Sequence, residues 1–265
     1  MGPTGRAELK GRPSLPFDPV ERAQWVEGVV MDGEKRKYYR LRPARYYGGI
    51  ATADAVGCCL LCAYCWNYRR NLDPGRTDGF FLSPGDVARR LLEILRRKGF
   101  NKVRISGAEP VLGWPSFQHL VGVLEIIARH EPMVDFVLET NGLMFGADPA
   151  LAKELSGFRR LLVRICIKGW DGASFERISG ARSEFFGLPL EGLRHILDAG
   201  ITAWPAVMYE IFGPRGIEEV SEVLRRYGIS PEELEIEYLE PYPFVMDNLR
   251  DRKVELRAEP ILWER

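Results

Sequence analysis

Strand-like and helix-like stretches alternate from residue 48 to about residue 240, and this alternation limits the possible folds most strongly. Strands are expected at residues 48–56, 101–106, 133–140, 160–168, 201–210 and 234–239. Helices are expected at residues 83–100, 117–130, 147–158, 190–200 and 217–228. The first of these begins with Ser83 as a cap and Pro84 in its first turn, and its apolar residues recur at helical spacing. About six β-α units fit parallel strands joined by helical crossovers. An open doubly wound sheet and a partial barrel both satisfy this pattern.

Two flanking segments differ from the core at residues 48–240. Residues 1–47 form an extension in which residues 25–42 predict a hairpin around Asp32-Gly33, adding edge strands to the main sheet. The first 18 residues, rich in Pro and Gly, are expected to be poorly ordered. In the segment 241–265, Ile261, Leu262 and Trp263 are expected to pack back onto the core.

Composition limits the cellular setting more than the partner. No apolar run approaches the roughly 20 residues of a membrane span, and the N-terminus has no apolar signal-peptide core. We therefore expect a soluble, cytoplasmic protein without a membrane partner. The 37 basic residues equal the 37 acidic ones, so net charge indicates no partner. Five Asn and two Gln beside many Arg and Glu are typical of a thermophile.

Four of the five cysteines lie within residues 56–67, VGCCLLCAYCWN. Spacing alone permits two triplets, Cys58 or Cys59 together with Cys62 and Cys65, and neighbouring thiolates suit a soft metal centre. A structural zinc site needs four closed ligands, and no second cysteine pair is present. A disulfide would close a very tight loop. Three thiolates instead fit a four-iron cluster with one iron left open, because clusters normally have four cysteine ligands.

The segment Cys58-x-x-x-Cys62-x-Tyr64-Cys65 resembles the cluster motif of the radical S-adenosylmethionine (radical SAM) enzymes. The resemblance implies a partial (β/α)6 barrel over about residues 48–240. It also implies a [4Fe-4S] cluster on Cys58, Cys62 and Cys65, with S-adenosylmethionine (SAM) at the open iron. An external one-electron donor would then drive cleavage of SAM to a 5′-deoxyadenosyl radical. Tyr64 would lie beside the cofactor.

Three further motifs follow predicted strands in the order of this family. Ser106-Gly107-Ala108-Glu109-Pro110 is similar to the Gly-Gly-Glu-Pro segment, which implies that Gly107, Ala108 and Glu109 contact SAM, with Glu109 accepting its ammonium group. Residues 139–142, ETNG, and 166–171, CIKGWD, resemble motifs of the branch that contains the glycyl-radical-enzyme activases. They imply cofactor contacts from Glu139 and Asn141, and a Lys168 that pairs with the methionine carboxylate. Ligands commonly bind at such strand ends in parallel α/β folds.

Cys166 stands where the activases usually have Asp, so the cation site of that branch is not expected here. Cys166 is either a functional thiol or a small buried residue, and free cysteines are commonly buried. The fifth strand offers Ala206, Met208 and Glu210 as adenine contacts. Without a second cysteine-rich segment, no auxiliary cluster is expected.

The substrate stays open between a protein, a peptide, RNA and a small molecule. The activase-like motifs favour hydrogen abstraction from a glycine of a partner protein. Residues 35–47 hold six basic residues and four tyrosines, which could bind RNA or form a solvated charged hairpin face. A protein of a different class, a non-catalytic iron–sulfur electron carrier, would bind a cluster but would not cleave SAM.

Overall fold

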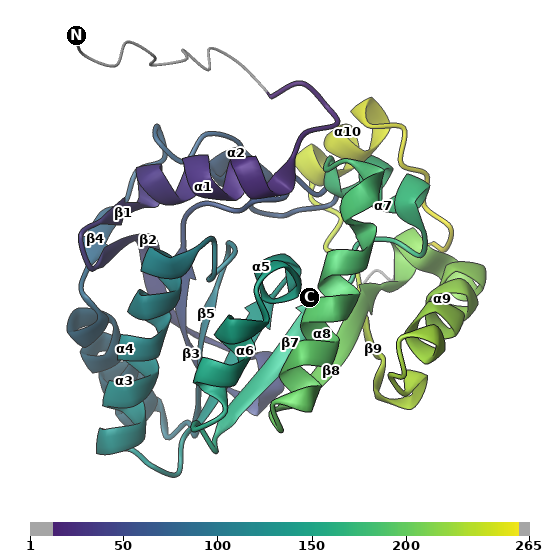
Figure 1. The fold of residues 1–265 in the computed structure, drawn as a ribbon. Coiled ribbons are helices and arrows are strands. Elements are labelled where there is room, and N and C mark those ends of the chain that lie inside the picture. Colours follow the sequence, from purple (N-terminus) through teal and green to yellow (C-terminus); the bar gives the residue numbers. More distant parts are fainter. Residues whose placement is uncertain (1–12, 260–265) are drawn as a thin grey trace, which may run out of the picture.

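The computed structural model describes residues 13–259. Figure 1 shows the helices α1 (Pro19–Val30), α2 (Tyr68–Leu72), α3 (Pro84–Lys98), α4 (Trp114–His130), α5 (Leu143–Ala147), α6 (Pro149–Leu155), α7 (Gly172–Ser179), α8 (Leu188–Asp198), α9 (Tyr209–Arg226) and α10 (Pro243–Asp251). The strands are β1 (Met31–Asp32), β2 (Lys35–Ala44), β3 (Ile50–Ala55), β4 (Phe80–Leu82), β5 (Lys102–Ser106), β6 (Asp135–Thr140), β7 (Leu161–Cys166), β8 (Thr202–Met208) and β9 (Glu235–Glu237). The expected packing of Ile261, Leu262 and Trp263 lies outside the described residues.

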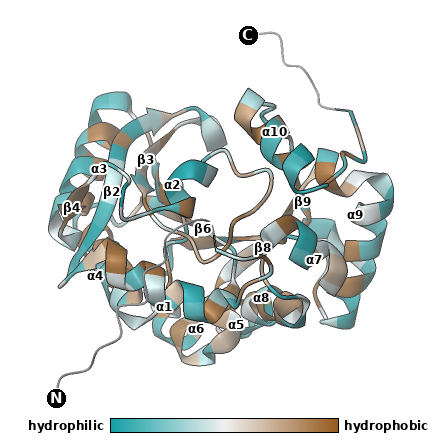
Figure 2. Cartoon of the chain, turned by 90° about the horizontal axis from the view of Figure 1, so that it is seen from above, coloured by the Kyte–Doolittle hydropathy of each residue, from teal (hydrophilic) through white to brown (hydrophobic). Residues whose placement is uncertain are grey.

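One sheet contains the nine strands of the described residues, in the order β1-β2-β3-β5-β6-β7-β8-β9, with β4 paired to β2. The six strands from β3 to β9 in this order are parallel, whereas β2 pairs with β3 and β1 in antiparallel fashion. The view from above shows helices in an arc around this sheet (Figure 2). The predicted α/β partial (β/α)6 barrel with an N-terminal antiparallel hairpin is therefore confirmed.

The first arm of the predicted hairpin is a helix. Asp18 accepts hydrogen bonds from the backbone N–H groups of Val20 and Glu21, and Pro19 occupies the first turn, so α1 begins there. Val26 and Val30 pack against Gly57, where a Cβ atom would lie 2.5 Å from Val26 Cγ1. The β-branched residues that favoured a strand are thus buried on one side of a helix, and only β1 remains strand before the turn.

The expected disorder of the first 18 residues is wrong for Phe17 and Asp18, and residues 1–12 lie outside the described part of the chain. Phe17 forms an isolated parallel bridge with Ala181. The Asp18 carboxylate pairs with Arg182, so this entry to α1 is fixed against the segment after α7.

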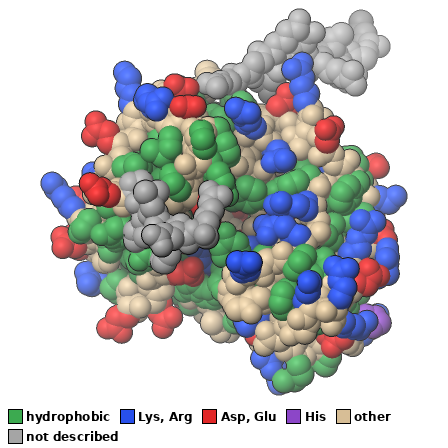
Figure 3. All heavy atoms as spheres, turned by 180° about the vertical axis from the view of Figure 1, so that it is seen from behind, with side chains coloured by type: hydrophobic (Ala, Val, Ile, Leu, Met, Phe, Trp, Pro, Cys, Tyr) green, Lys and Arg blue, Asp and Glu red, His purple; other side chains and the backbone are tan. Residues whose placement is uncertain are grey.

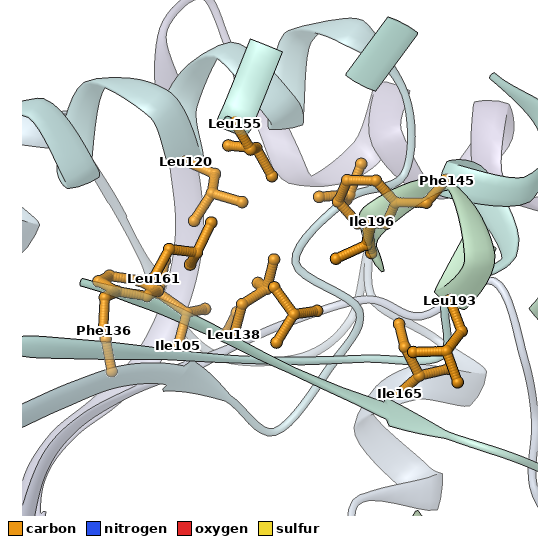
Figure 4. Close-up of a cluster of buried hydrophobic side chains, with 14 of the residues drawn as sticks. Ile105, Leu120, Phe136, Leu138, Phe145, Leu155, Leu161, Ile165, Leu193 and Ile196 are labelled. Carbon is orange, nitrogen blue, oxygen red and sulfur yellow. The ribbon is translucent and has the colours of Figure 1, made fainter. Parts of the chain in front are cut away.

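The core lies between the sheet and the helices α4, α5, α6 and α8. Figure 4 shows Ile105, Phe136, Leu138, Leu161 and Ile165 of the strands facing Leu120, Phe145, Leu155, Leu193 and Ile196 of these helices. All of them are at most 2% exposed. Burial of apolar area stabilises the fold by roughly 25 cal/mol per Å². This packing holds the parallel strands against the helices and thereby sets the position of the C-terminal ends of the strands.

Pro205 lies inside β8, although proline is unusual away from a sheet edge. The Ile167 N–H donates to the Ala206 carbonyl, so Ala206 directs its backbone groups toward β7. The backbone groups of Pro205, one residue earlier, point to the opposite side of β8, where β9 lies. Pairing of β8 with β9 begins only at Ala206. The missing N–H of Pro205 therefore leaves the β8–β9 ladder intact.

Four further helices, α2, α5, α7 and α10, were not predicted. Two of them, α5 and α7, each lie between a strand and a longer helix. Both follow motif segments: α5 begins after Gly142, and α7 is capped by Asp171, whose carboxylate accepts a hydrogen bond from the Ser174 N–H. Among the described residues, no helix has the length and apolar character to cross a membrane.

A glycine contact positions α8 against the turn that carries Asn141. At Gly192 a Cβ atom would lie 2.2 Å from the Gly142 carbonyl oxygen. Ala favours a helix by about 1 kcal/mol over Gly, but overpacking costs about 1–3 kcal/mol. We expect Gly192→Ala to lower the free energy of unfolding by about 1–2 kcal/mol in a denaturant titration. Gly28→Ala in α1 is the control, because nothing lies within 4 Å of its Cβ position and a small gain is expected. A stabilised Gly192→Ala would contradict the contact.

Candidate active site

The cysteine loop, residues 57–65, is fixed through its own backbone. The N–H groups of Leu61 and Ala63 donate to carbonyl oxygens in the last turn of α7. From α10, Arg252 Nη1 donates to the Leu61 carbonyl at 2.9 Å, and Asn248 Nδ2 donates to the Ala63 carbonyl at 2.5 Å. The loop is thus held between two helices in a defined conformation.

Three of the four clustered cysteines face one cavity of about 800 Å³, namely Cys58, Cys62 and Cys65. Cys59 is fully buried and does not line this cavity. Its Sγ accepts a hydrogen bond from Asn141 Nδ2 at 3.2 Å. The structure therefore separates the two triplets that spacing left open: Cys58 shares the cavity with Cys62 and Cys65, and Cys59 does not.

The three thiols are a poor site for a single metal ion. Within residues 13–259, no group of three His, Cys, Asp or Glu side chains converges closely enough to hold one ion. An iron–sulfur cube binds each thiolate through a different iron, so its ligands stand further apart than those of one zinc ion. This donor set fits a cluster better than zinc.

Two buried guanidinium groups next to the loop also fit a group with net negative charge. Arg36 is 1% exposed and donates through Nη2 to the Glu109 carbonyl at 2.7 Å, while its Nε and Nη1 have no partner in the described structure. Arg22 donates through Nη2 to the Asn71 carbonyl at 2.6 Å, and its Nε also has no described partner. Buried charges without compensation are costly. A four-iron cluster together with its three thiolate ligands has a net negative charge, which would compensate these guanidinium groups.

We expect Arg22→Met to make the bound cluster harder to reduce. Its guanidinium is stacked between Phe17 and Trp25, 5.4 Å from each ring centroid, and interacts electrostatically with Cys58. A buried unit charge of this kind contributes on the order of 1–2 kcal/mol at an effective dielectric of about 20, which is roughly 60 mV for a one-electron couple. A redox titration followed by electron paramagnetic resonance measures this potential. Arg22→Lys keeps the charge and should stay near the wild-type value; equal potentials in all three proteins would contradict the expectation.

Glu109 joins the motif segments of β5 and β6. Its Oε1 accepts from Thr140 Oγ1 at 2.6 Å and from the Val111 N–H at 3.2 Å, and its Oε2 accepts from the Asn141 N–H at 2.8 Å. The carboxyl group lines the cavity but is only 3% exposed. Burial raises the pKa of Glu109 to about 7, although these hydrogen bonds and Arg36 oppose the rise.

Glu139 is only partly buried and lies among basic and hydroxyl groups. Its Oε1 accepts from Arg104 Nη1 at 2.5 Å and from the Tyr47 hydroxyl at 3.0 Å, and its Oε2 accepts from Ser106 Oγ at 2.9 Å. Burial alone would raise the pKa of Glu139, but the attraction of Arg104 and Arg164 outweighs it and leaves the pKa below the ordinary value. Both oxygens are thus used by neighbouring side chains.

Lys168 and Cys166 lie on the β7 side of the cavity. The Lys168 Nζ is 5.2 Å from the Tyr64 ring centroid, a cation–π arrangement. Arg164 Nη1 donates to Cys166 Sγ at 3.0 Å, and the same guanidinium pairs with Glu235 at 3.0 Å and Glu237 at 2.6 Å. Cys166 is half-buried and lines the cavity, which favours a functional thiol over the small buried residue of the other interpretation.

The ionisation of the three thiols differs. Burial raises the pKa of Cys62 to about 12 and of Cys65 to about 11, whereas a hydrogen bond with Cys59 lowers the pKa of Cys58. Because metal ligands must be deprotonated, binding of a cluster by these thiols would release protons from Cys62 and Cys65.

The three predicted cluster ligands and most of the predicted SAM contacts line this cavity: Cys58, Cys62, Tyr64, Cys65, Gly107, Ala108, Glu109, Glu139, Asn141, Lys168 and Met208. Two of the three candidates for the adenine do not. Ala206 is 1% exposed within the sheet, and the buried Glu210 accepts a hydrogen bond from the Leu239 N–H at 2.8 Å. The amide of Asn141 lines the cavity but is already bonded to Cys59 and to the Leu143 N–H.

The basic hairpin segment is not a simple solvated face. Arg40 and Arg42 both pair with the fully buried carboxylate of Asp54, at 2.7 and 2.8 Å. Tyr46 lies over the Arg104 guanidinium, 4.8 Å from it. Replacing Arg40 and Arg42 by acidic residues would leave the buried Asp54 carboxylate without a counter-ion and would lower the stability of the protein. Such variants therefore cannot be used to test RNA binding.

Sequence analysis missed several cavity residues, chiefly Arg104, Arg164, Glu235 and Glu237. A usable pattern was present: Arg104 and Ser106, like Arg164 and Cys166, stand two residues apart within apolar strands. Since alternate residues of a strand face the same side, such polar pairs indicate one polar face above the core.

Charge is distributed unevenly around the mouth of the cavity. Arg40 and Arg42 line the β2 side, and Glu235, Glu237 and Glu240 line the β9 side. Figure 3 shows the face opposite to that of Figure 1, with basic side chains gathered over the half that contains β2 and more acidic ones over the other half. A bound molecule would therefore meet opposite charges on the two sides.

A partial barrel with three cavity-facing cysteines in a loop after its first parallel strand defines a class of iron–sulfur enzymes that generate radicals. The family comparison agrees with this class: the model of the Radical SAM superfamily matches residues 54–228. The chain belongs to this superfamily and is a radical SAM enzyme, with a [4Fe-4S] cluster and SAM as its cofactors.

Curated relatives are GTP 3′,8-cyclases. That of Mycolicibacterium smegmatis is 30% identical over 188 residues, which are 68% of this chain and 47% of that protein. That of Mycobacterium marinum is 31% identical over 170 residues, 63% of this chain and 43% of that protein. The chain thus spans less than half the length of these relatives.

Solved structures share the fold. Native anSMEcpe with bound AdoMet has a TM-score of 0.52 at 16% identity, covering 68% of this chain and 48% of that one. Streptococcus suis SuiB bound to S-adenosylmethionine has a TM-score of 0.51 at 15% identity, covering 75% and 46%.

Proposed function

We propose that the cavity of about 800 Å³ is the active site, in which Cys58, Cys62 and Cys65 hold the [4Fe-4S] cluster. The supporting observation is that these three thiols and the predicted SAM contacts other than Ala206 and Glu210 line the same cavity, whereas Cys59 is fully buried and does not line it. When bound, the cluster supplies the electron that cleaves SAM to methionine and a 5′-deoxyadenosyl radical, which takes a hydrogen atom from the substrate.

The chain's own residues bind and orient SAM in this proposal. Ionised Glu109 accepts the ammonium group, and Lys168 pairs with the methionine carboxylate. Tyr64 and Met208 offer apolar contacts for the adenosine part, and Gly107 and Ala108 form the adjoining turn. The Glu109 carboxylate is preorganised by its three hydrogen bonds, so binding requires little reorganisation.

For the substrate, we propose a purine nucleotide first. The names of the curated relatives indicate GTP, and the β2 side of the mouth combines Arg40 and Arg42 with Tyr46 and Tyr47. Guanidinium groups suit phosphate and tyrosine rings suit a base. Since Asp54 already neutralises part of this charge, one or two phosphates are better matched than a full triphosphate.

The second candidate is a glycine or another residue in a peptide or partner protein. The motifs at residues 139–142 and 166–171 support it, as does the acidic β9 side of the mouth, which fits a chain that carries a positive charge. RNA has less support, because four of the six basic residues of the hairpin, Arg36, Lys37, Arg40 and Arg42, are engaged within the protein.

Anaerobic reconstitution followed by dithionite reduction tests these proposals. We expect 5′-deoxyadenosine to form with SAM alone and to form faster when the substrate is present. GTP, GMP, a glycine-containing peptide and a short RNA are compared, and each is analysed by mass spectrometry for loss of a hydrogen atom or a new bond. A stable cluster that neither binds nor cleaves SAM would instead identify an electron carrier.

A further inference from the structure

A second, smaller cavity lies next to the cysteine loop. Its volume is about 560 Å³, and Arg69 and Arg70 of α2 are among its lining residues, together with Tyr39 and Phe244. Trp66, which directly follows Cys65, lines both cavities and is 39% exposed. The wall between the active-site cavity and this surface is therefore formed by the residues just after the last cysteine.

The helix α2 spans the short distance between the thiol of Cys65 and this surface. On its inner side, Asn71 is buried and its Nδ2 lies 3.7 Å from Cys65 Sγ. On its outer side, Arg69 and Arg70 are exposed. One turn of helix thus separates a group beside the proposed cluster ligand from two surface cations.

Aromatic rings and a hydrogen bond hold these cations in place, and within residues 13–259 neither of them forms an ion pair. Arg70 lies 4.4 Å from the Tyr39 ring centroid and donates to Asn67 Oδ1 at 3.1 Å, and Arg69 lies 5.8 Å from the Phe244 ring. Asp78 is the acidic residue among those that line the cavity, and the nearby Asp73 is paired with Arg76. We call Trp66, Arg69 and Arg70 with their cavity the α2 patch. It is basic and rimmed by aromatic rings, and it lies closest to the side of the cluster that Cys65 would hold.

We propose that the α2 patch is the docking surface for an acidic one-electron carrier protein. The substrate reaches the cluster through the larger cavity, so a carrier seated on α2 would not block it. In the transfer the reduced carrier loses one electron and the oxidised cluster gains it, and no bond or proton is exchanged. Complementary charge would raise the association rate of such a carrier. The inference rests on the proposed function only in requiring a cluster on Cys65.

Reduced flavodoxin, an acidic flavin carrier, is the probe. Anaerobic stopped-flow absorbance follows reduction of the reconstituted holoenzyme at increasing flavodoxin concentration and at two ionic strengths. We expect a salt-sensitive second-order rate constant that falls at least about 10-fold in the Arg69→Glu, Arg70→Glu double variant. Arg225→Glu, Arg226→Glu is the matched control, since these adjacent arginines are exposed at the end of α9. Reduction by dithionite and dithionite-driven SAM cleavage should not change in either variant.

Each outcome has a defined meaning. Equal flavodoxin rates in the two double variants, or a wild-type rate that ignores salt, would overturn the docking proposal even if dithionite still drives SAM cleavage. Substitution of Arg70 also removes its hydrogen bond to Asn67 and could disturb α2. Arg69→Glu alone, which keeps that hydrogen bond, is therefore the second variant. It must show a partial, salt-sensitive loss with an unchanged cluster spectrum. Absence of SAM cleavage with dithionite in the wild type would instead count against the proposed function.

Discussion

Replacing Cys58 by alanine is expected to abolish cluster binding and to lower 5′-deoxyadenosine formation by at least about 100-fold, whereas Cys59→Ala retains both. Loss of outer-shell partners alone typically costs 10–100-fold in affinity or activity, and Cys58 is proposed as a direct ligand. Cys59 lies in the core against Asn141, so its removal creates a small void, expected to lower the free energy of unfolding by about 1–2 kcal/mol.

The two adjacent positions form a matched pair, because the substitution and the local sequence are the same. Iron content, the absorbance near 400 nm (about the region of thiolate-to-iron charge transfer) and thermal unfolding are measured for both variants after anaerobic reconstitution. A Cys59→Ala protein without a cluster, beside a Cys58→Ala protein that keeps one, would reverse the assignment of the triplet. Folding of both variants is checked in the metal-free state, which separates ligand loss from collapse of the loop.

Sequence analysis could predict which residues gather at the proposed active site because they follow parallel strands. The order of residues along a strand fixes which of them reach its C-terminal end, and β5, β6 and β7 bring Glu109, Asn141 and Lys168 to one edge. Spacing alone permits both Cys58 and Cys59, and only the resemblance to the family favours Cys58. The sequence does not reveal that the Cys59 thiol contacts Asn141, which is 82 residues away along the chain.

Tertiary contacts also explain the errors in the N-terminal extension. Residues 25–30 contain three valines and a tryptophan, a composition that favours a strand, yet the Asp18 cap and Pro19 begin a helix that buries Val26 and Val30 against the cysteine loop. Likewise, nothing local indicates that Arg40 and Arg42 share the carboxylate of Asp54 on the neighbouring strand. Local composition cannot reveal a partner that the sheet brings close.

Binding of SAM is expected to weaken about tenfold for each pH unit below about 7. In the free protein, burial raises the pKa of Glu109 to about 7, so the carboxyl is largely neutral at pH 6. A neutral carboxyl cannot pair with the ammonium group of SAM, and binding at low pH must therefore release a proton. Because this pKa is higher in the folded than in the unfolded protein, Glu109 adds to the free energy of unfolding of the SAM-free protein at low pH. This contribution is lost as the pH rises through about 7.

Isothermal titration of the cluster-loaded enzyme, in two buffers of different ionisation enthalpy, measures both the affinity and the proton release. Glu109→Gln should weaken SAM binding roughly 30-fold or more, the equivalent of about 2 kcal/mol or above for a lost buried charge pair, and should remove the pH dependence between 6 and 8 (about one unit either side of the raised value). Glu139 cannot produce this effect, because its pKa lies below the ordinary value and it stays ionised throughout the range. A Glu109→Gln enzyme that binds SAM with wild-type affinity, or one that keeps the full pH dependence, would mean that another group receives the ammonium.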